Sequence, residues 1–275
     1  MNNLLFLLTI AFTFTAPFLQ TSIKSQNPVK SHKNNKKSDI FAKMMKKDVV
    51  IIGGGFAGLS IAIELAQRGR MVTVLRKSRK DAASHAAGGM IAPQSERLPS
   101  STYLNLCLES RNMYSEWITK IEQISGSERN ESGFLSRGGF IAPAFEKDQV
   151  HTFIPPKDSG KFHWLAKDEL LKLEPSLTDQ IIGGWVFPQD MSVDARKLFK
   201  VLDKACYNLG IEILENISAN GIVYDSDGLK ICNILLDDGR NISCETVVGC
   251  SGAWMRELFS VPISPQKGQM MSLRP

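Results

Sequence analysis

The sequence predicts an α/β fold in which helices pack on a parallel sheet, and three observations support it. Residues 48–52 are almost wholly apolar, as a buried parallel strand is. Glycines follow at the spacing G-x-G-x-x-G, and the apolar periodicity after them predicts a helix from Leu59 to Arg68. The run MVTVL, residues 71–75, then has the composition of a second strand.

Each glycine of the loop has a mechanical task. Gly53 allows the tight turn from strand to helix, Gly55 lets a pyrophosphate approach the backbone, and Gly58 lets the helix pack on the sheet. The N–H groups of the first helical turn favour phosphate charge. A glycine turn without a ligand is the alternative, but the setting between strand and helix indicates a Rossmann-like dinucleotide site. The loop residues are Gly53, Gly54, Gly55, Phe56, Ala57 and Gly58.

The middle of the chain indicates a second, smaller domain. The run SHAAGGMIAPQSE, residues 84–96, is rich in small residues, so it is either a simple loop or a close approach to a flat ligand. Apolar spacing predicts a helix from Tyr103 to Ile124. Between Phe134 and Phe187, short apolar segments predict antiparallel strands, with a helix from Ala166 to Leu173 among them.

The last third returns to the first pattern. A helix is predicted from Val193 to Leu209, with Gly210 ending it, and a strand follows at residues 211–214. Two or three strands joined by Asp-Gly turns are then expected. The final apolar strand, Thr246 to Cys250, leads into small residues that fit a second close approach to a ligand.

Composition excludes several classes of partner and site. The net charge is +5, but residues 1–47 contribute +7 (eight lysines, one acid) and leave −2 for the rest, so no nucleic-acid surface is indicated. Five cysteines form no C-x-x-C pair and have no histidine at metal spacing. We therefore expect packed, reduced thiols and no metal site.

Residues 1–45 have the composition of a targeting presequence. An apolar, uncharged run from Leu4 to Leu19 has the length of a signal-peptide core, and a lysine-rich, acid-poor stretch resembling a transit peptide follows. This order is typical of bipartite presequences for plastids bounded by extra membranes. Secretion, or anchoring in a membrane through residues 4–19, is the alternative.

Five motifs in one order carry a family resemblance. They are IIGGGFAGLSIA, SHAAGGMIAPQSE, VDARKL, VVGCSGAW and PQKGQM. From about Lys47 to Pro275 the chain resembles the D-amino-acid oxidase superfamily of flavoproteins, in particular the glycine oxidases of thiamine biosynthesis in cyanobacteria and plastids. Sarcosine oxidases and D-amino-acid dehydrogenases share this frame and stay open as alternatives.

The resemblance implies a Rossmann-like FAD-binding domain plus a partial antiparallel α+β substrate domain. It implies that the loop at Gly53–Gly58 contacts the FAD pyrophosphate and that Ala219 contacts the adenine through its main chain. The remaining contacts that it implies are His85, Ala86, Ala87, Gly88, Gly89 and Met90 along the flavin ring, and Ser251 and Gly252 in a second cofactor loop.

The implied reaction is oxidation of the C–N bond of a small amine or amino acid to an imine. Hydride passes to the flavin, and oxygen accepts the electrons as hydrogen peroxide. A hand-over of the product to thiazole synthase and a homo-oligomer are further expectations, and no nucleic acid is expected as a partner.

The sequence departs from the family at the ribose position. The residue that ends the second strand is usually acidic, so that it holds the ribose hydroxyls. Here Arg76 and Lys77 stand there. An arginine can accept a 2′-phosphate, so NADP stays open, and Arg76 can equally be a solvated turn residue.

The expected domains are residues 46–100 with 190–258, which bind FAD, and residues 101–189 with 259–275 on the substrate side. The family's carboxylate-binding arginine is expected beyond Pro275, and the local candidates Arg137 and Arg256 are better explained as surface residues. A catalytically inactive FAD- or NADP-binding remnant, or an NADP-binding reductase module, is therefore the alternative to an oxidase.

Overall fold

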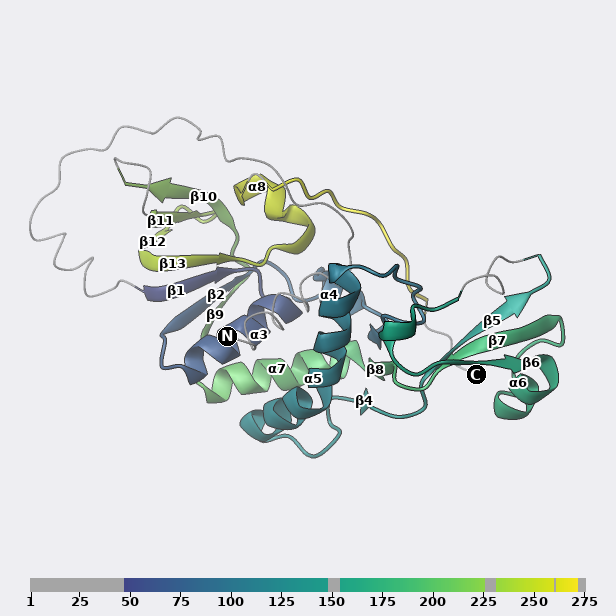
Figure 1. Ribbon diagram of the computed structural model, residues 1–275. Helices are drawn as coiled ribbons and strands as arrows, with labels where there is room; N and C mark the ends of the chain where they lie inside the picture. Colours follow the sequence, from purple (N-terminus) through teal and green to yellow (C-terminus); the bar gives the residue numbers. More distant parts are fainter. Residues whose placement is uncertain (1–46, 148–153, 226–230, 260, 272–275) are drawn as a thin grey trace, which may run out of the picture. The chain divides into compact units, whose positions relative to one another are not determined.

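The computed structural model describes residues 47–147, 154–225, 231–259 and 261–271 (Figure 1). The predicted presequence, residues 1–45, lies outside the described residues. The chain divides into two compact units. The glycine-loop unit comprises, within the described ranges, residues 47–87, 124–126 and 199–271, and the tryptophan-rich unit comprises Gly88–Gln123 and Ser127–Leu198. No helix within the described ranges has the length and apolar character that crossing a membrane requires.

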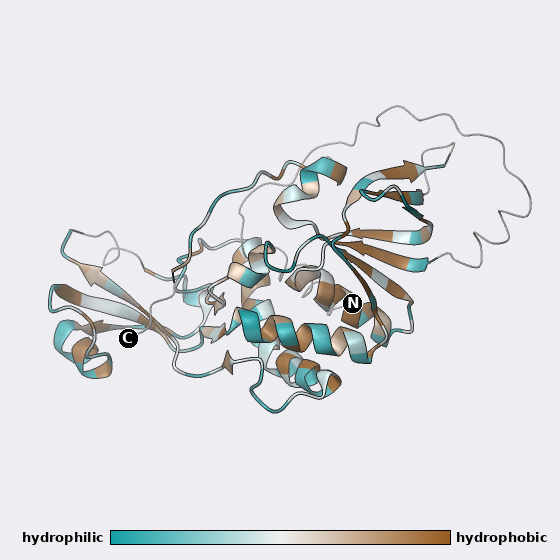
Figure 2. Ribbon diagram, turned by 180° about the vertical axis from the view of Figure 1, so that it is seen from behind, coloured by the Kyte–Doolittle hydropathy of each residue, from teal (hydrophilic) through white to brown (hydrophobic). Residues whose placement is uncertain are grey.

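A four-stranded parallel sheet forms the centre of the glycine-loop unit. Its strands follow in the order β13 (Cys244–Gly249), β1 (Lys47–Ile52), β2 (Val72–Arg76) and β9 (Glu212–Glu215). Helix α3 (Phe56–Gln67) connects β1 to β2. Val50, Ile51 and Val74 are completely buried, which explains why these strands read as continuous apolar runs. Figure 2 shows the hydrophobic residues concentrated on this sheet.

A small antiparallel sheet packs on one face of the parallel sheet. It consists of β10 (Ala219–Tyr224), β11 (Ile231–Leu236) and β12 (Asn241–Ile242), followed later by the short helices η3 (Gly252–Trp254) and α8 (Met255–Phe259). The shared core is formed by Val50, Ile52, Leu75, Ile234, Leu236 and Cys244. Ile51 alternates to the other face, where it lies against Gly58 of α3.

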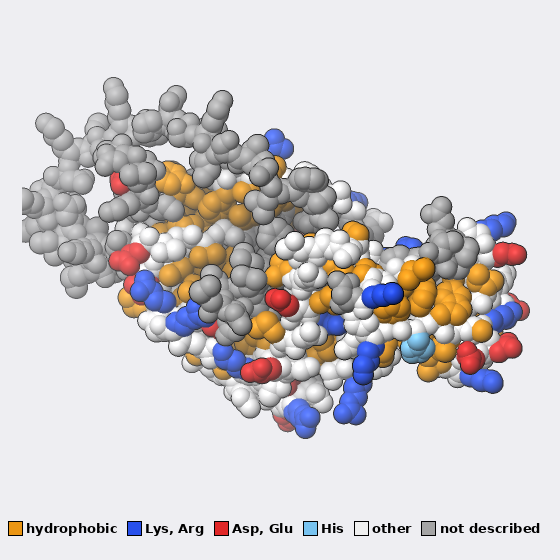
Figure 3. Space-filling model, viewed as in Figure 1, with side chains coloured by type: hydrophobic (Ala, Val, Ile, Leu, Met, Phe, Trp, Pro, Cys, Tyr) orange, Lys and Arg blue, Asp and Glu red, His pale blue; other side chains and the backbone are white. Residues whose placement is uncertain are grey.

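The tryptophan-rich unit contains two three-stranded sheets. The first is β3 (Met90–Ile91), β8 (Met191–Val193) and β4 (Phe134–Leu135), and the second is β5 (Phe140–Phe145), β7 (Ile181–Phe187) and β6 (His163–Ala166). All their pairings are antiparallel. Helix α6 (Lys167–Leu173) packs on the second sheet through the fully buried Leu170. Figure 3 shows hydrophobic side chains gathered over this sheet.

The two longest helices among the described residues, α5 (Thr102–Ser125) and α7 (Ala195–Asn208), and the 3₁₀ helix η2 (Lys157–Ser159) provide further residues of the site. Helix α5 belongs to the tryptophan-rich unit up to Gln123, and η2 precedes β6. Helix α7 contains the division between the units, after Leu198.

The structure confirms the predicted α/β class and the order of its elements. Two helix starts differ from the prediction by more than one residue. Helix α3 begins at Phe56, three residues before Leu59, because the helix includes the last part of the glycine loop. Helix α7 begins at Ala195 because Val193 pairs with Phe134 in a sheet and the Asp194 carboxylate caps the helix, accepting two backbone N–H groups at 3.0 Å each.

Candidate functional site

The glycine loop lies at the carboxyl end of β1, and two of its positions have no room for a side chain. A Cβ on Gly53 would lie 2.1 Å from the carbonyl oxygen of Cys250. A Cβ on Gly58 would lie 1.8 Å from the carbonyl oxygen of Gly53. Gly55 differs, because among the described residues, its chain neighbours aside, the Ser84 hydroxyl oxygen at 3.1 Å is the only atom near its Cβ position. The backbone at Gly55 is therefore open to a ligand, as a pyrophosphate loop requires.

The start of α3 has the electrostatics of an anion site. Its first regular hydrogen bond runs from the Leu59 N–H to the Gly55 carbonyl at 3.0 Å, and its first turn contains no acidic residue. The Phe56 N–H donates to the Ser84 hydroxyl oxygen at 3.0 Å. Ser84 lies on α4 (Ala83–Ala86), so this bond fastens the SHAAGG segment to the glycine loop. Helix N–H groups and the helix dipole favour phosphate here.

The predicted second cofactor loop lies beside the first. The Cys250 N–H donates to the Ile52 carbonyl at 2.7 Å, and the Ser251 nitrogen would lie 2.9 Å from a Cβ on Gly53. Gly252 has a φ of +56° and open space around its Cβ position. The Ser251 hydroxyl oxygen is buried and has no hydrogen-bond partner among the described residues, as a group that binds a ligand would be.

Ala219, the predicted adenine contact, lies close to the end of β2. The Ile217 N–H donates to the Arg76 carbonyl at 3.4 Å, which joins the two segments. The Ser218 hydroxyl oxygen between them is also buried, and no hydrogen-bond partner for it lies in the part of the chain that the structure describes. The glycine-loop unit thus brings together Gly53–Gly58, Ser251, Ala219 and Arg76. Their arrangement fits the pyrophosphate and adenosine parts of FAD.

Arg76 is not the solvated turn residue that one interpretation of the sequence gave. It is the last residue of β2 and only 5% exposed. Its Nη1 donates to the Asp203 carboxylate at 2.7 Å, and its Nε and Nη2 donate to the Glu215 carboxylate. Burial alone would lower the pKa of Arg76, but these two carboxylates outweigh it and raise the pKa above its usual value. Lys77, next to it, is exposed.

The predicted flavin-contacting stretch crosses the division between the units, after Ala87. In the glycine-loop unit, the His85 ring lies 6.4 Å from the buried Phe199 ring, centroid to centroid. In the tryptophan-rich unit, Gly89 has a φ of +76°, and a Cβ there would lie 1.8 Å from the Val193 carbonyl oxygen. Ala86, Gly88 and Met90 are exposed, as residues that face a ligand must be.

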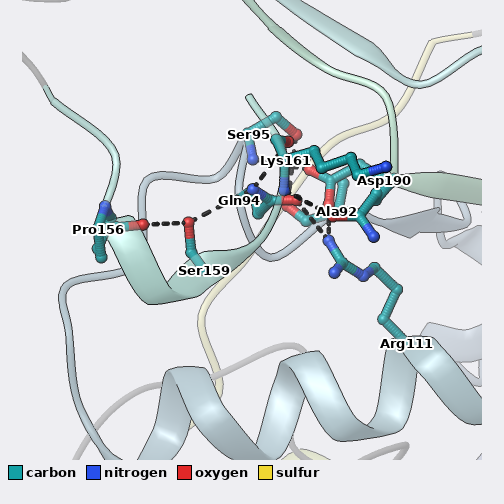
Figure 4. A network of polar contacts seen from close by, with 9 residues as sticks. Ala92, Gln94, Ser95, Arg111, Pro156, Ser159, Lys161 and Asp190 are labelled. Carbon is teal, nitrogen blue, oxygen red and sulfur yellow. Dashed lines mark hydrogen bonds and ion pairs between the residues drawn. The ribbon is translucent and has the colours of Figure 1, made fainter. Parts of the chain in front are cut away.

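A buried polar network holds the loop that follows this stretch (Figure 4). Arg111 of α5 donates to the Asp190 carboxylate at 2.9 Å and to the Gln94 side-chain oxygen at 2.6 Å. The Ser95 N–H donates to the other oxygen of Asp190 at 2.8 Å. Gln94 in turn donates to the Ser159 hydroxyl at 3.4 Å. The network therefore fixes residues 94–95, which follow the end of β3 after two residues.

The two local candidates for a carboxylate-binding arginine, Arg137 and Arg256, are both exposed, which agrees with their interpretation as surface residues. Within the described residues, Cys107, Cys206 and Cys250 are free thiols. In the part of the chain that the structure describes, no three His, Cys, Asp or Glu residues gather in a way that could hold a metal ion.

Sequence reasoning missed Ser84, Glu215 and the Arg111 network. A signal existed for Glu215, because the segments VTVLR and EILE, which form β2 and β9, end in opposite charges. In a parallel sheet such ends meet at one edge, and Arg76 does pair with Glu215 in register. Arg111 and Asp190 are far apart in sequence, and nothing local indicates that they meet.

Comparison with known proteins identifies the family. The family model described as FAD dependent oxidoreductase (DAO) matches residues 48–275. The bifunctional protein ThiO/ThiG of a Synechocystis species is 38% identical over 229 residues, which are 82% of this chain and 33% of that protein. Glycine oxidase of Geobacillus kaustophilus is 31% identical over 237 residues, which are 82% of this chain and 61% of the relative.

The solved structures give the same result. The crystal structure of glycine oxidase from Geobacillus kaustophilus superposes with a TM-score of 0.68 at 28% identity, covering 78% of this chain and 58% of that one. The chain thus spans about a third of the bifunctional relatives and somewhat under two thirds of the glycine oxidases. The match over residues 48–275 and the glycine loop together show that the chain belongs to the DAO family of FAD-dependent oxidoreductases.

Proposed function

We propose that this chain provides the FAD-binding part of an enzyme that oxidises glycine, or a closely similar small amine, to the imine. The observation that carries the proposal is the glycine loop, in which Gly53 and Gly58 leave no space for a Cβ while Gly55 stays open. Support for the substrate class comes from the relatives, which are named glycine oxidases or ThiO/ThiG proteins.

The residues of the glycine-loop unit have binding tasks in this proposal. The first turn of α3 holds the pyrophosphate, and the buried hydroxyls of Ser251 and Ser218 donate to the cofactor. When bound, FAD supplies the hydride acceptor and the site at which oxygen is reduced to hydrogen peroxide.

The residues of the tryptophan-rich unit have a positioning task. Gly88 to Met90 offer backbone groups to the flavin ring, and Gly89 fits only as glycine because of the Val193 carbonyl. The Arg111–Asp190 pair holds the Ser95 N–H, so the segment after Met90 keeps one conformation. A rigid segment of this kind orients a reacting ring at little entropic cost.

The test is peroxide release by the purified chain, loaded with FAD and given glycine, sarcosine or D-alanine in separate assays. We expect glycine to give the fastest release. Faster release from sarcosine would indicate the sarcosine-oxidase type instead. Bound flavin with no release from any of the three would contradict oxidase activity of this chain by itself, and binding of NADP without FAD would favour a reductase module.

Two further parts of the proposal concern partners and location. We propose that the imine passes to thiazole synthase, and the ThiO/ThiG names of the relatives support this. Co-purification of thiazole synthase with the chain, and conversion of glycine by the pair, would test it.

We also propose plastid targeting by residues 1–45. A fluorescent protein fused behind residues 1–46 should enter plastids, whereas retention in secretory membranes would contradict this location.

A further inference from the structure

The ribose end of the predicted FAD site contains an arginine where dinucleotide-binding folds place an acid. That acid normally ends the second strand and accepts hydrogen bonds from the ribose hydroxyls. Arg76 ends β2 in this chain, and an arginine cannot accept a hydrogen bond. Either the ribose hydroxyls lack an acceptor, or another residue supplies one.

The neighbouring strand supplies a carboxylate at the same edge. Glu215 ends β9, and its Cα is the register partner of Arg76 in the parallel sheet. Arg76 Nε donates to both Glu215 oxygens, at 3.1 and 3.0 Å, and Arg76 Nη2 donates to one of them. Because the Glu215 side chain is still 48% exposed, its carboxylate is held from one side and faces solvent on the other.

The charges of this ribose-end cluster, defined as Arg76, Arg79, Asp203 and Glu215, balance. Asp203 pairs with both arginines, at 2.7 Å to Arg76 and 3.1 Å to Arg79, and Glu215 pairs with Arg76. Both guanidinium groups also lie over the Phe199 ring, within 6 Å of its centroid as cation–π contacts require. A 2′-phosphate would therefore meet two carboxylates and no unpaired arginine, which disfavours NADP.

The position of the cluster matches the place of the ribose. The Arg76 side chain covers Gly54, because a Cβ there would lie 2.7 Å from the Arg76 Cδ. On its other side, the Arg76 carbonyl accepts the Ile217 N–H, two residues before the predicted adenine contact Ala219. Arg76, which holds Glu215, therefore contacts the pyrophosphate loop through Gly54 and the adenine segment through Ile217. Glu215 lies between these two parts of the predicted FAD site.

We propose that Glu215, held in place by Arg76, is the acceptor for a ribose hydroxyl of FAD. A carboxylate has about four lone-pair sites, so the three bonds from Arg76 leave about one site for a hydroxyl donor. The inference rests on FAD binding at the glycine loop and does not depend on which amine the enzyme oxidises.

The test compares ligands with and without the ribose hydroxyls, using calorimetric titration of the flavin-free chain. ADP is compared with 2′,3′-dideoxy-ADP. Charge-assisted hydrogen bonds predict that the unmodified chain prefers ADP by about 10-fold or more. Glu215→Gln should lose most of this preference. Glu212→Gln is the matched control, since Glu212 lies on the same strand but pairs with Lys47 and Thr73. This variant should prefer ADP over 2′,3′-dideoxy-ADP as strongly as the unmodified chain does.

Circular dichroism shows whether each variant is folded. Should Glu215→Gln fail to fold, Glu215→Asp keeps the charge opposite Arg76 and shortens the side chain, and it should reduce the preference for ADP. An unchanged preference in a folded Glu215 variant would overturn the proposal, as would equal binding of both ligands by the unmodified chain. Tighter binding of 2′,5′-ADP than of ADP would assign the cluster to a 2′-phosphate instead. Failure of the oxidase proposal would appear only in the peroxide assay.

Discussion

Replacing Arg111 with methionine should destabilise the tryptophan-rich unit strongly. Arg111 and Asp190 are 3% and 0% exposed, so the pair is fully removed from water. Methionine has a similar length but carries no charge, and Asp190 would keep only the Ser95 N–H as a donor. Gln94 would also lose the donor that its oxygen now has at 2.6 Å. Breaking one partner of a buried pair costs about 3–5 kcal/mol, which is a large part of the stability of a domain.

Urea unfolding followed by tryptophan fluorescence measures this cost. Trp117, Trp164 and Trp185, three of the four tryptophans, lie in the same unit as Arg111, so the signal reports mainly on that unit. Arg137→Met is the control, since Arg137 lies in the same unit as Arg111 but is exposed. Substitutions at the surface usually change stability by about 0.5 kcal/mol or less, so the control should unfold almost as the unmodified chain does.

The double variant Arg111→Met with Asp190→Asn separates charge from packing. Asparagine keeps an oxygen for the Ser95 N–H but removes the unpaired charge, so the double variant should be more stable than Arg111→Met alone. A cost below about 1 kcal/mol for Arg111→Met would refute the reasoning, because the pair would then behave as an exposed one.

Three further changes have defined outcomes. Gly58→Ala should weaken FAD binding in a flavin-fluorescence titration, because the alanine Cβ would lie 1.8 Å from the Gly53 carbonyl oxygen. Gly221→Ala is the control and should bind FAD normally, because the nearest described atom to its Cβ belongs to the Leu235 side chain, 3.4 Å away. Ser84→Ala removes the acceptor of the first amide of α3 and should cost about 1 kcal/mol of stability in urea unfolding; no measurable loss would contradict this. Burial raises the pKa of the Cys206 and Cys250 thiols from about 9 to about 12, so both should react slowly with a thiol reagent at pH 8. The free energy of unfolding should fall as the pH rises from about 9 to 12, because these thiols lose their protons in the unfolded chain before they do so in the folded one. Fast labelling of Cys206 or Cys250 in the folded chain at pH 8, located by peptide mapping, would contradict that burial.

The parallel sheet and the glycine loop were predictable because their signals are local. A strand buried on both faces needs a continuous apolar run, and a turn without room for a Cβ needs glycine, so β1, Gly53 and Gly58 could be found from sequence. The antiparallel strands β5 and β7 were equally visible between their turns. The FAD assignment needed the family resemblance, and the individual contacts to the flavin stay predictions.

Side-chain partners that are distant in sequence were not predictable. Arg76 looked either like a phosphate ligand or like a solvated turn residue, because its environment depends on Asp203 and Glu215, more than a hundred residues away. The Arg111–Asp190 pair likewise depends on how α5 packs near β8. Helix α7 started two residues later than predicted, since the apolar Val193 suits a strand as well as a helix.

Titration of the flavin-free chain with FAD tests most directly whether the glycine loop holds this cofactor. The loop geometry and the family predict saturable binding of one FAD per chain, with a shifted flavin absorption spectrum. Absence of saturable FAD binding by the folded chain, or binding of NADP in its place, would contradict the assignment of Gly53, Gly55 and Gly58 to the pyrophosphate of FAD.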